Sequence, residues 1–80
     1  MINDEQLNFM VSLKIPNIIL EIIRRLGISK DKAFDMFYRS ETYKLLSDRG
    51  SYYWGESAGF VTDSFIREYQ GLPIEEFENI

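Results

Sequence analysis

The apolar segment that follows Pro16 constrains the fold of this chain more than any other feature. Its apolar residues recur at helical spacing and form a face wide enough to be buried between neighbouring elements. They are Ile18, Ile19, Ile22, Ile23 and Leu26. Arg24 and Arg25 fall in the last turn, where cations suit the helix dipole, and Gly27 is placed to end the helix in a left-handed conformation. We therefore expect a core helix over residues 16–26.

An earlier helix is predicted to begin at Asn3, which has the spacing of a capping box with Gln6. Leu7, Met10 and Val11 supply its apolar stripe. A proline inside a helix lacks the amide donor and crowds the preceding turn. We therefore expect a break or kink at residues 14–16, and a new helix after it.

Three serines mark further helix starts. Ser29 is a suitable N-cap for residues 30–39, where Ala33, Phe34, Phe37 and Tyr38 form a stripe. Ser40 offers a cap for a short helix with Tyr43, Leu45 and Leu46 that ends near Asp48, so residues 29–49 form either two helices or one bent helix. Ser57 caps a last helix, whose inward residues are expected to be Val61, Phe65, Ile66 and Tyr69.

These segments predict an all-α protein, a compact bundle of four to five short helices with an aromatic connector around residues 51–55. That connector is interpreted as extended, or as a strand without a clear second strand to pair with. Residues 1–72 form one helical domain, and residues 73–80 form an acidic tail that is flexible or a short helix. The expected core is Ile19, Ile22, Ile23, Leu26, Phe34, Phe37, Leu45, Leu46, Val61 and Phe65.

The composition bears on chemistry as well. The chain has no Cys and no His, so it lacks a thiol nucleophile, the usual general base and the commonest metal ligands. We expect a protein that is not an enzyme and that holds no cofactor or metal. The acidic N-terminus is unlike a signal peptide, and the longest apolar run, residues 18–20, is too short to span a bilayer, so a cytoplasmic protein with no membrane partner is predicted.

A set of residues distributed along the chain also resembles a known group. The residues are Leu26, Gly27, Ile28, Ser29, Ala33, Phe37, Tyr38, Ser40, Thr42, Tyr43, Leu45, Leu46, Trp54 and Ser57. The pattern is similar to that of short bacterial proteins of unknown function that are often encoded beside a toxin-like protein with an ADP-ribosyltransferase-type fold. The resemblance implies an antitoxin role and a cognate toxin as partner. Pro16 is a departure, because relatives continue a helix at that position.

Two groups of residues are candidates for partner binding. Tyr52, Tyr53 and Trp54 lie between glycines, and Tyr and Trp are common in interface hot spots. Trp54 is expected in the core, while Tyr52 and Tyr53 point apart if extended, so one of them stays exposed. The second group is in the tail, where apolar and acidic residues alternate: Ile74, Glu75, Glu76, Phe77 and Glu78. The tail is either a solvated terminus or a segment that orders on a basic partner surface, where its acids imitate phosphates.

Two alternatives to binding another protein remain open. Arg24, Arg25, Lys30 and Lys32 flank a turn with helix-turn-helix spacing, so DNA binding is the first. Asp31 would be repelled by phosphates, and residues 48–80 carry seven acidic and two basic side chains, so nucleic acid is the less favoured partner. The second is a homodimer or structural domain that shares the apolar face of residues 18–26 between two copies.

Overall fold

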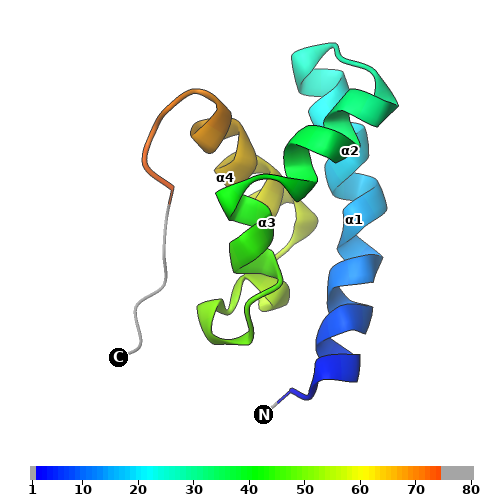
Figure 1. Ribbon diagram of the computed structural model, residues 1–80, viewed down its shortest axis with the longest axis vertical. Coiled ribbons are helices and arrows are strands. Elements are labelled where there is room, and N and C mark those ends of the chain that lie inside the picture. The colour runs from blue at the N-terminus through cyan, green and yellow to red at the C-terminus, as the bar shows by residue number, and fades with distance from the viewer. Residues whose placement is uncertain (1, 75–80) are drawn as a thin grey trace.

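The structure, a computed structural model, describes residues 2–74, and every regular element in this part of the chain is helical. The elements in chain order are α1 (Asp4–Leu26), α2 (Lys30–Tyr38), α3 (Glu41–Leu46), the 3₁₀ turns η1 (Arg49–Ser51) and η2 (Tyr53–Gly55), and α4 (Ala58–Tyr69). The predicted all-α class is confirmed. Figure 1 shows α1 along one side of the molecule and α2 crossing the upper part of α1. Helices α3 and α4 lie on the other side of the molecule.

Local capping sets most of the helix boundaries. The Asn3 side chain accepts from the Gln6 amide at 2.8 Å, and the Gln6 side chain accepts from the Asn3 amide at 3.0 Å. Ser29 and Ser57 cap α2 and α4 through their hydroxyl oxygens. Gly27 ends α1 with φ 64°, a left-handed conformation that disfavours residues with a Cβ. These predicted caps are confirmed.

The predicted break at residues 14–16 is wrong, because α1 runs without interruption for 23 residues and contains Pro16. Pro16 is exposed, so the helix lacks one amide hydrogen bond on its solvent side only. Val11 before the proline and Ile18 after it are both buried on the inner face. Packing of both halves against the same neighbours therefore holds the helix together through a residue that disfavours it.

The core lies between α1, α2, α3, α4 and the turn η2. The buried hydrophobic residues are Leu7, Val11, Ile18, Ile19, Ile22, Ala33, Phe37, Leu46, Tyr53, Val61 and Phe65. Six predicted core residues are among them, whereas Ile23, Leu26, Phe34 and Leu45 are only partly buried at its edge. Phe37 is at its centre and makes edge-to-face contacts with Phe65 and Tyr43, at ring distances of 5.7 and 5.5 Å.

Two aromatic residues that were expected to face inward are exposed. Tyr38 is 45 % exposed, at the rim of the core, where its ring centroid lies 4.8 Å from that of Tyr43. Tyr69 is 55 % exposed in the last turn of α4. On α2 the buried positions are Ala33 and Phe37, and Tyr38 lies beside this stripe with partly buried Phe34, so it stays at the rim of the core. Tyr69 lies in the last turn of α4, beyond the buried residues of that helix.

Residues 29–49 form two helices rather than one bent helix, with Ser40 between them. The Ser40 hydroxyl donates to the Phe37 carbonyl at 2.6 Å and accepts from the Tyr43 amide at 3.0 Å. A second cap comes from α4. The Glu68 carboxylate accepts from the amides of Glu41 and Thr42, both at 2.9 Å, and from the Thr42 hydroxyl at 2.8 Å.

Glu68 should therefore stabilise the start of α3 from a distant part of the chain. We predict that Glu68→Ala lowers the free energy of unfolding by about 1–3 kcal/mol, because three donors lose a charged acceptor. Glu41→Ala is the matched control: within residues 2–74 its exposed carboxylate pairs with exposed Lys44 alone, and its loss should cost less than about 1 kcal/mol. Urea unfolding followed by circular dichroism measures both, and equal losses would contradict this role of Glu68.

Candidate interaction surface

The aromatic connector is two consecutive 3₁₀ turns, so the expectation of an extended segment or strand was wrong. The reversal occurs at Tyr52, which has φ 65° and is the one residue other than glycine with a positive φ among residues 2–74. This left-handed backbone is uncommon for a residue with a Cβ. It turns successive side chains to opposite sides: Tyr53 is fully buried, and Tyr52 is 52 % exposed. The prediction that one of these two tyrosines stays exposed is confirmed.

Tyr53, rather than Trp54, is the large aromatic residue at the centre of the core. Its hydroxyl lies 3.3 Å from the Ser64 hydroxyl, which satisfies its polar end. Trp54 is only partly buried and packs against the edge of the core. Its indole Nε1 donates to the Arg49 carbonyl at 2.9 Å, and its ring lies 6.5 Å from that of Tyr52. The hydrogen bond to Arg49 and the packing against the core therefore fix the position of the indole ring, while part of the ring stays exposed to solvent.

Arg49 fastens this turn to the beginning of the chain. Its guanidinium donates to the Asp4 carboxylate at 2.6 Å and to the Ile2 carbonyl at 3.2 Å. Segments 45 to 47 residues apart in sequence are thereby placed side by side. Ile2 consequently lies next to Trp54.

Two open pockets adjoin at Ile2 and Trp54. One, of about 660 Å³, is lined by Ile2, Asn3, Glu5, Gln6, Phe9, Met10 and Trp54. The other, of about 540 Å³, is lined by Ile2, Arg49, Gly50, Tyr52 and Trp54. Phe9 is 62 % exposed and lies at the edge of the first pocket. We refer to Ile2, Phe9, Tyr52 and Trp54 together as the aromatic surface.

Of the three connector residues predicted to bind a partner, Tyr52 and Trp54 belong to this surface, whereas the prediction for Tyr53 is wrong because its side chain is fully buried. The sequence did not predict Ile2, Phe9 or Arg49 as part of this surface. Phe9 carried a signal that was available. It lies two residues from both Leu7 and Val11, so it falls off the inward apolar stripe of its helix, and an aromatic residue outside that stripe is a candidate for contact with another molecule. Ile2 and Arg49 meet only because the chain folds back, and no local pattern indicates that.

The predicted tail site falls mostly outside the described residues. Glu75, Glu76, Phe77 and Glu78 are beyond them, whereas Ile74 is partly buried and lines a pocket of about 440 Å³ beside Phe60 and Arg67. The Arg67 side chain donates to the Pro73 carbonyl at 2.8 Å. Residues 73 and 74 therefore lie against α4.

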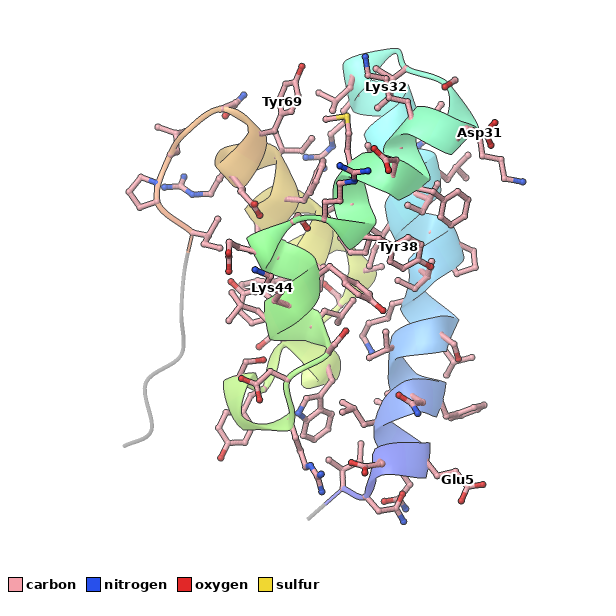
Figure 2. The ribbon with its side chains drawn as sticks, in the orientation of Figure 1. Glu5, Asp31, Lys32, Tyr38, Lys44 and Tyr69 are labelled. Atoms are coloured by element: carbon pink, nitrogen blue, oxygen red, sulfur yellow. The ribbon has the colours of Figure 1, made fainter. Side chains whose placement is uncertain are left out.

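The basic residues of the DNA-binding alternative surround the corner between α1 and α2, and Lys32 and Asp31 are both at this corner in Figure 2. Arg24 pairs with Glu21 at 3.0 Å, and Arg25 pairs with Asp63 at 2.7 Å. Asp31 and Asp35 are exposed on α2. A phosphate backbone approaching this corner would meet acidic groups among the bases, which weakens electrostatic attraction.

Among residues 2–74, no cluster of three or more acidic side chains that would hold a metal ion is found. By length and composition α1 is apolar enough to cross a membrane, a test that the core helices of soluble proteins also pass. In this structure its inner face packs in the core. The chain matches no protein family model, no curated protein and no solved structure.

Removing the Arg49 side chain tests how the aromatic surface is assembled. The ion pair with Asp4 is largely exposed, so we predict that Arg49→Ala lowers the free energy of unfolding by less than about 1 kcal/mol. It should nevertheless shift the emission of the single tryptophan to longer wavelength, because the start of the chain is no longer held at the pockets that Ile2 and Trp54 line. Arg39→Ala, which removes another exposed ion pair, should leave the emission unchanged. Identical spectra for the two variants would show that Arg49 does not order this surface.

Proposed function

We propose that this protein is a non-catalytic interaction module that binds a partner protein through the aromatic surface. The observation that carries the proposal is the exposure of Phe9 and Tyr52, at 62 % and 52 %, beside a partly buried Trp54. Phe9 and Tyr52 line the two pockets that share Ile2 and Trp54, and contiguous exposed apolar surface of this kind marks interaction sites. Tyr and Trp in a partly desolvated pocket are also the residue types that dominate binding energy at interfaces.

The backbone at Tyr52 supports the same proposal. A left-handed conformation costs a residue with a Cβ about 1–2 kcal/mol, and glycine would avoid this cost. The tyrosine ring, by contrast, is half exposed and adds little to the core. A strained position occupied by a large exposed side chain is more readily explained by contact with another molecule than by stability.

The resemblance to antitoxin-like proteins narrows the proposed partner to a toxin enzyme encoded by the neighbouring gene. Binding would neutralise it by covering its active site. The acidic C-terminal third suits a basic surface, such as a pocket that holds nucleotide phosphates. In this proposal the aromatic surface supplies apolar contact, and Glu75, Glu76 and Glu78 supply charge.

Tyr52→Gly separates binding from stability. The change relieves the backbone strain, so the free energy of unfolding should change by less than about 1 kcal/mol. The affinity for the protein encoded by the adjacent reading frame should fall at least about tenfold, because an aromatic contact is lost. Co-purification detects the complex, and calorimetric titration of the two purified proteins measures its affinity. Urea unfolding measures the free energy of unfolding of the variant.

Tyr69→Ala is the matched control for Tyr52→Gly. Tyr69 is exposed to a similar degree, 55 %, but lies at the opposite end of the molecule from Glu5, which lines the first pocket (Figure 2). It should leave the affinity unchanged. Equal affinities for wild type and Tyr52→Gly would contradict the use of the aromatic surface, and absence of binding to the neighbouring protein would contradict the antitoxin role.

Truncation after Ile74 tests the acidic tail separately. Removing residues 75–80 leaves the Arg67 contact to Pro73 in place and deletes three carboxylates. We predict weaker binding at low salt and a smaller loss of affinity as salt rises, since fewer charges contribute to association. An unchanged affinity and salt dependence would show that the tail takes no part.

A further inference from the structure

A second apolar feature lies on the outer face of α1. Phe9, Leu13 and Leu20 are 62 %, 58 % and 53 % exposed, and Pro16 between them is exposed as well. Successive members of this set are four, three and four residues apart, which aligns them along one side of an α-helix. We call these four residues the outer stripe. It lies opposite the inner face, where Val11, Ile18 and Ile22 are buried.

The outer stripe is not needed by the fold of this copy. Figure 1 shows α1 at the side of the molecule, with the other elements gathered along its inner side. The dimer face suggested by the sequence, residues 18–26, is largely used within one copy, because Ile18, Ile19 and Ile22 are in the core. The outer stripe is the part of α1 where large apolar side chains are most exposed, so it is the face of α1 best suited to association.

The spacing of the outer stripe fits a second copy of the same helix. Alternating steps of four and three residues are the a and d spacing by which two helices pack. The stripe is also symmetric about the point midway between residues 14 and 15. In an antiparallel pair, Phe9 of one copy therefore lies opposite Leu20 of the other, and Leu13 lies opposite Pro16. This arrangement is isologous and closes as a two-fold dimer.

The charges at the ends of α1 favour the same orientation. Exposed Glu5 is in its first turn, and Arg24, whose pair with Glu21 is itself exposed, is in its last. Asp4 and Arg25 are already paired within the copy, with Arg49 and Asp63. Antiparallel pairing brings the acidic end of each helix beside the basic end of the other and opposes the two helix dipoles. Parallel pairing would bring like charges together at both ends.

We propose that two copies of this chain form an antiparallel dimer through the outer stripes of their α1 helices. The segment from Glu5 to Arg24 is about 30 Å long, and one helix per copy buries less than the roughly 800 Å² per partner of a standard interface. The dimer is consequently weak, with a dissociation constant on the order of micromolar. Phe9 belongs to both surfaces, but Leu13 and Leu20 lie outside the aromatic surface, so variants at these two leucines test dimerisation without changing the proposed partner site.

Sedimentation velocity over a concentration range of about 1–500 µM tests association. Wild type should change from monomer to dimer, whereas Leu13→Glu should stay monomeric throughout with an unchanged circular dichroism spectrum, because its side chain is exposed. Leu72→Glu is the matched control: Leu72 is 47 % exposed but lies outside α1, so this variant should dimerise as wild type does.

Disulfide trapping tests the orientation, and the absence of cysteine from the chain makes it unambiguous. Phe9→Cys and Leu20→Cys proteins are mixed and oxidised with glutathione at the concentration where wild type is dimeric. Antiparallel pairing predicts that the mixed disulfide dominates, and mass spectrometry distinguishes it from the two symmetric ones. Parallel pairing predicts efficient symmetric disulfides in each protein alone.

Three results would overturn the proposal. The first is a wild-type monomer at all concentrations, and the second is a predominance of symmetric disulfides. The third is evidence that the outer stripe binds lipid instead of a second copy. In that case the wild type is a monomer that binds vesicles of phosphatidylcholine and phosphatidylglycerol, and the Leu13→Glu variant does not bind them.

Discussion

The continuity of α1 through Pro16 is the constraint on which the rest of the structure depends. A proline at this position removes one backbone hydrogen bond, yet its exposed position places that loss on the solvent side. On the inner side, residues from both halves of the helix enter one core, so a break would separate Leu7 and Val11 from Ile18 and Ile22. Burying each such side chain contributes about 1.5–3 kcal/mol, and several together outweigh the cost of about 3 kcal/mol for an interior proline. Tertiary packing therefore decides the local conformation.

One unbroken helix then has two apolar sides with different uses. Its inner side orders α2, α4 and η2, which in turn set Trp54 beside the start of α1. Its outer side has no counterpart within the described part of the chain and carries the outer stripe. Phe9 belongs to both the aromatic surface and the outer stripe. Partner binding and dimerisation are therefore expected to compete for Phe9. A change at Leu20 should affect dimerisation alone, and a change at Tyr52 should affect partner binding alone.

The features that the sequence alone predicts correctly are those that a few neighbouring residues determine. Asn3 with Gln6, Ser29, Ser57 and Gly27 each act within one turn of their own helix, and all behave as expected. Contacts across the chain could not be predicted in this way. The Glu68 carboxylate caps α3 from 26 and 27 residues away, and Arg49 positions Ile2. The choice of Tyr53 over Trp54 for the core depends on the left-handed backbone at Tyr52, which no residue preference indicates. Tyr52 and Trp54 were candidates because Tyr and Trp are common at interfaces, although Trp54 was expected in the core. Ile2 and Phe9 join them only through the fold.

Amide hydrogen exchange along α1 tests the central claim most directly. In a continuous helix, the amides of Asn17 and Ile18, which follow Pro16, donate to the Leu13 and Lys14 carbonyls of the preceding turn. They should exchange at least about a hundredfold more slowly than the same amides in an unfolded chain, and as slowly as those around Val11. If a new helix began at Pro16, its first amides would have no acceptors. Rapid exchange at Asn17 and Ile18 beside slow exchange around Val11, measured in dilute monomer, would contradict a continuous α1.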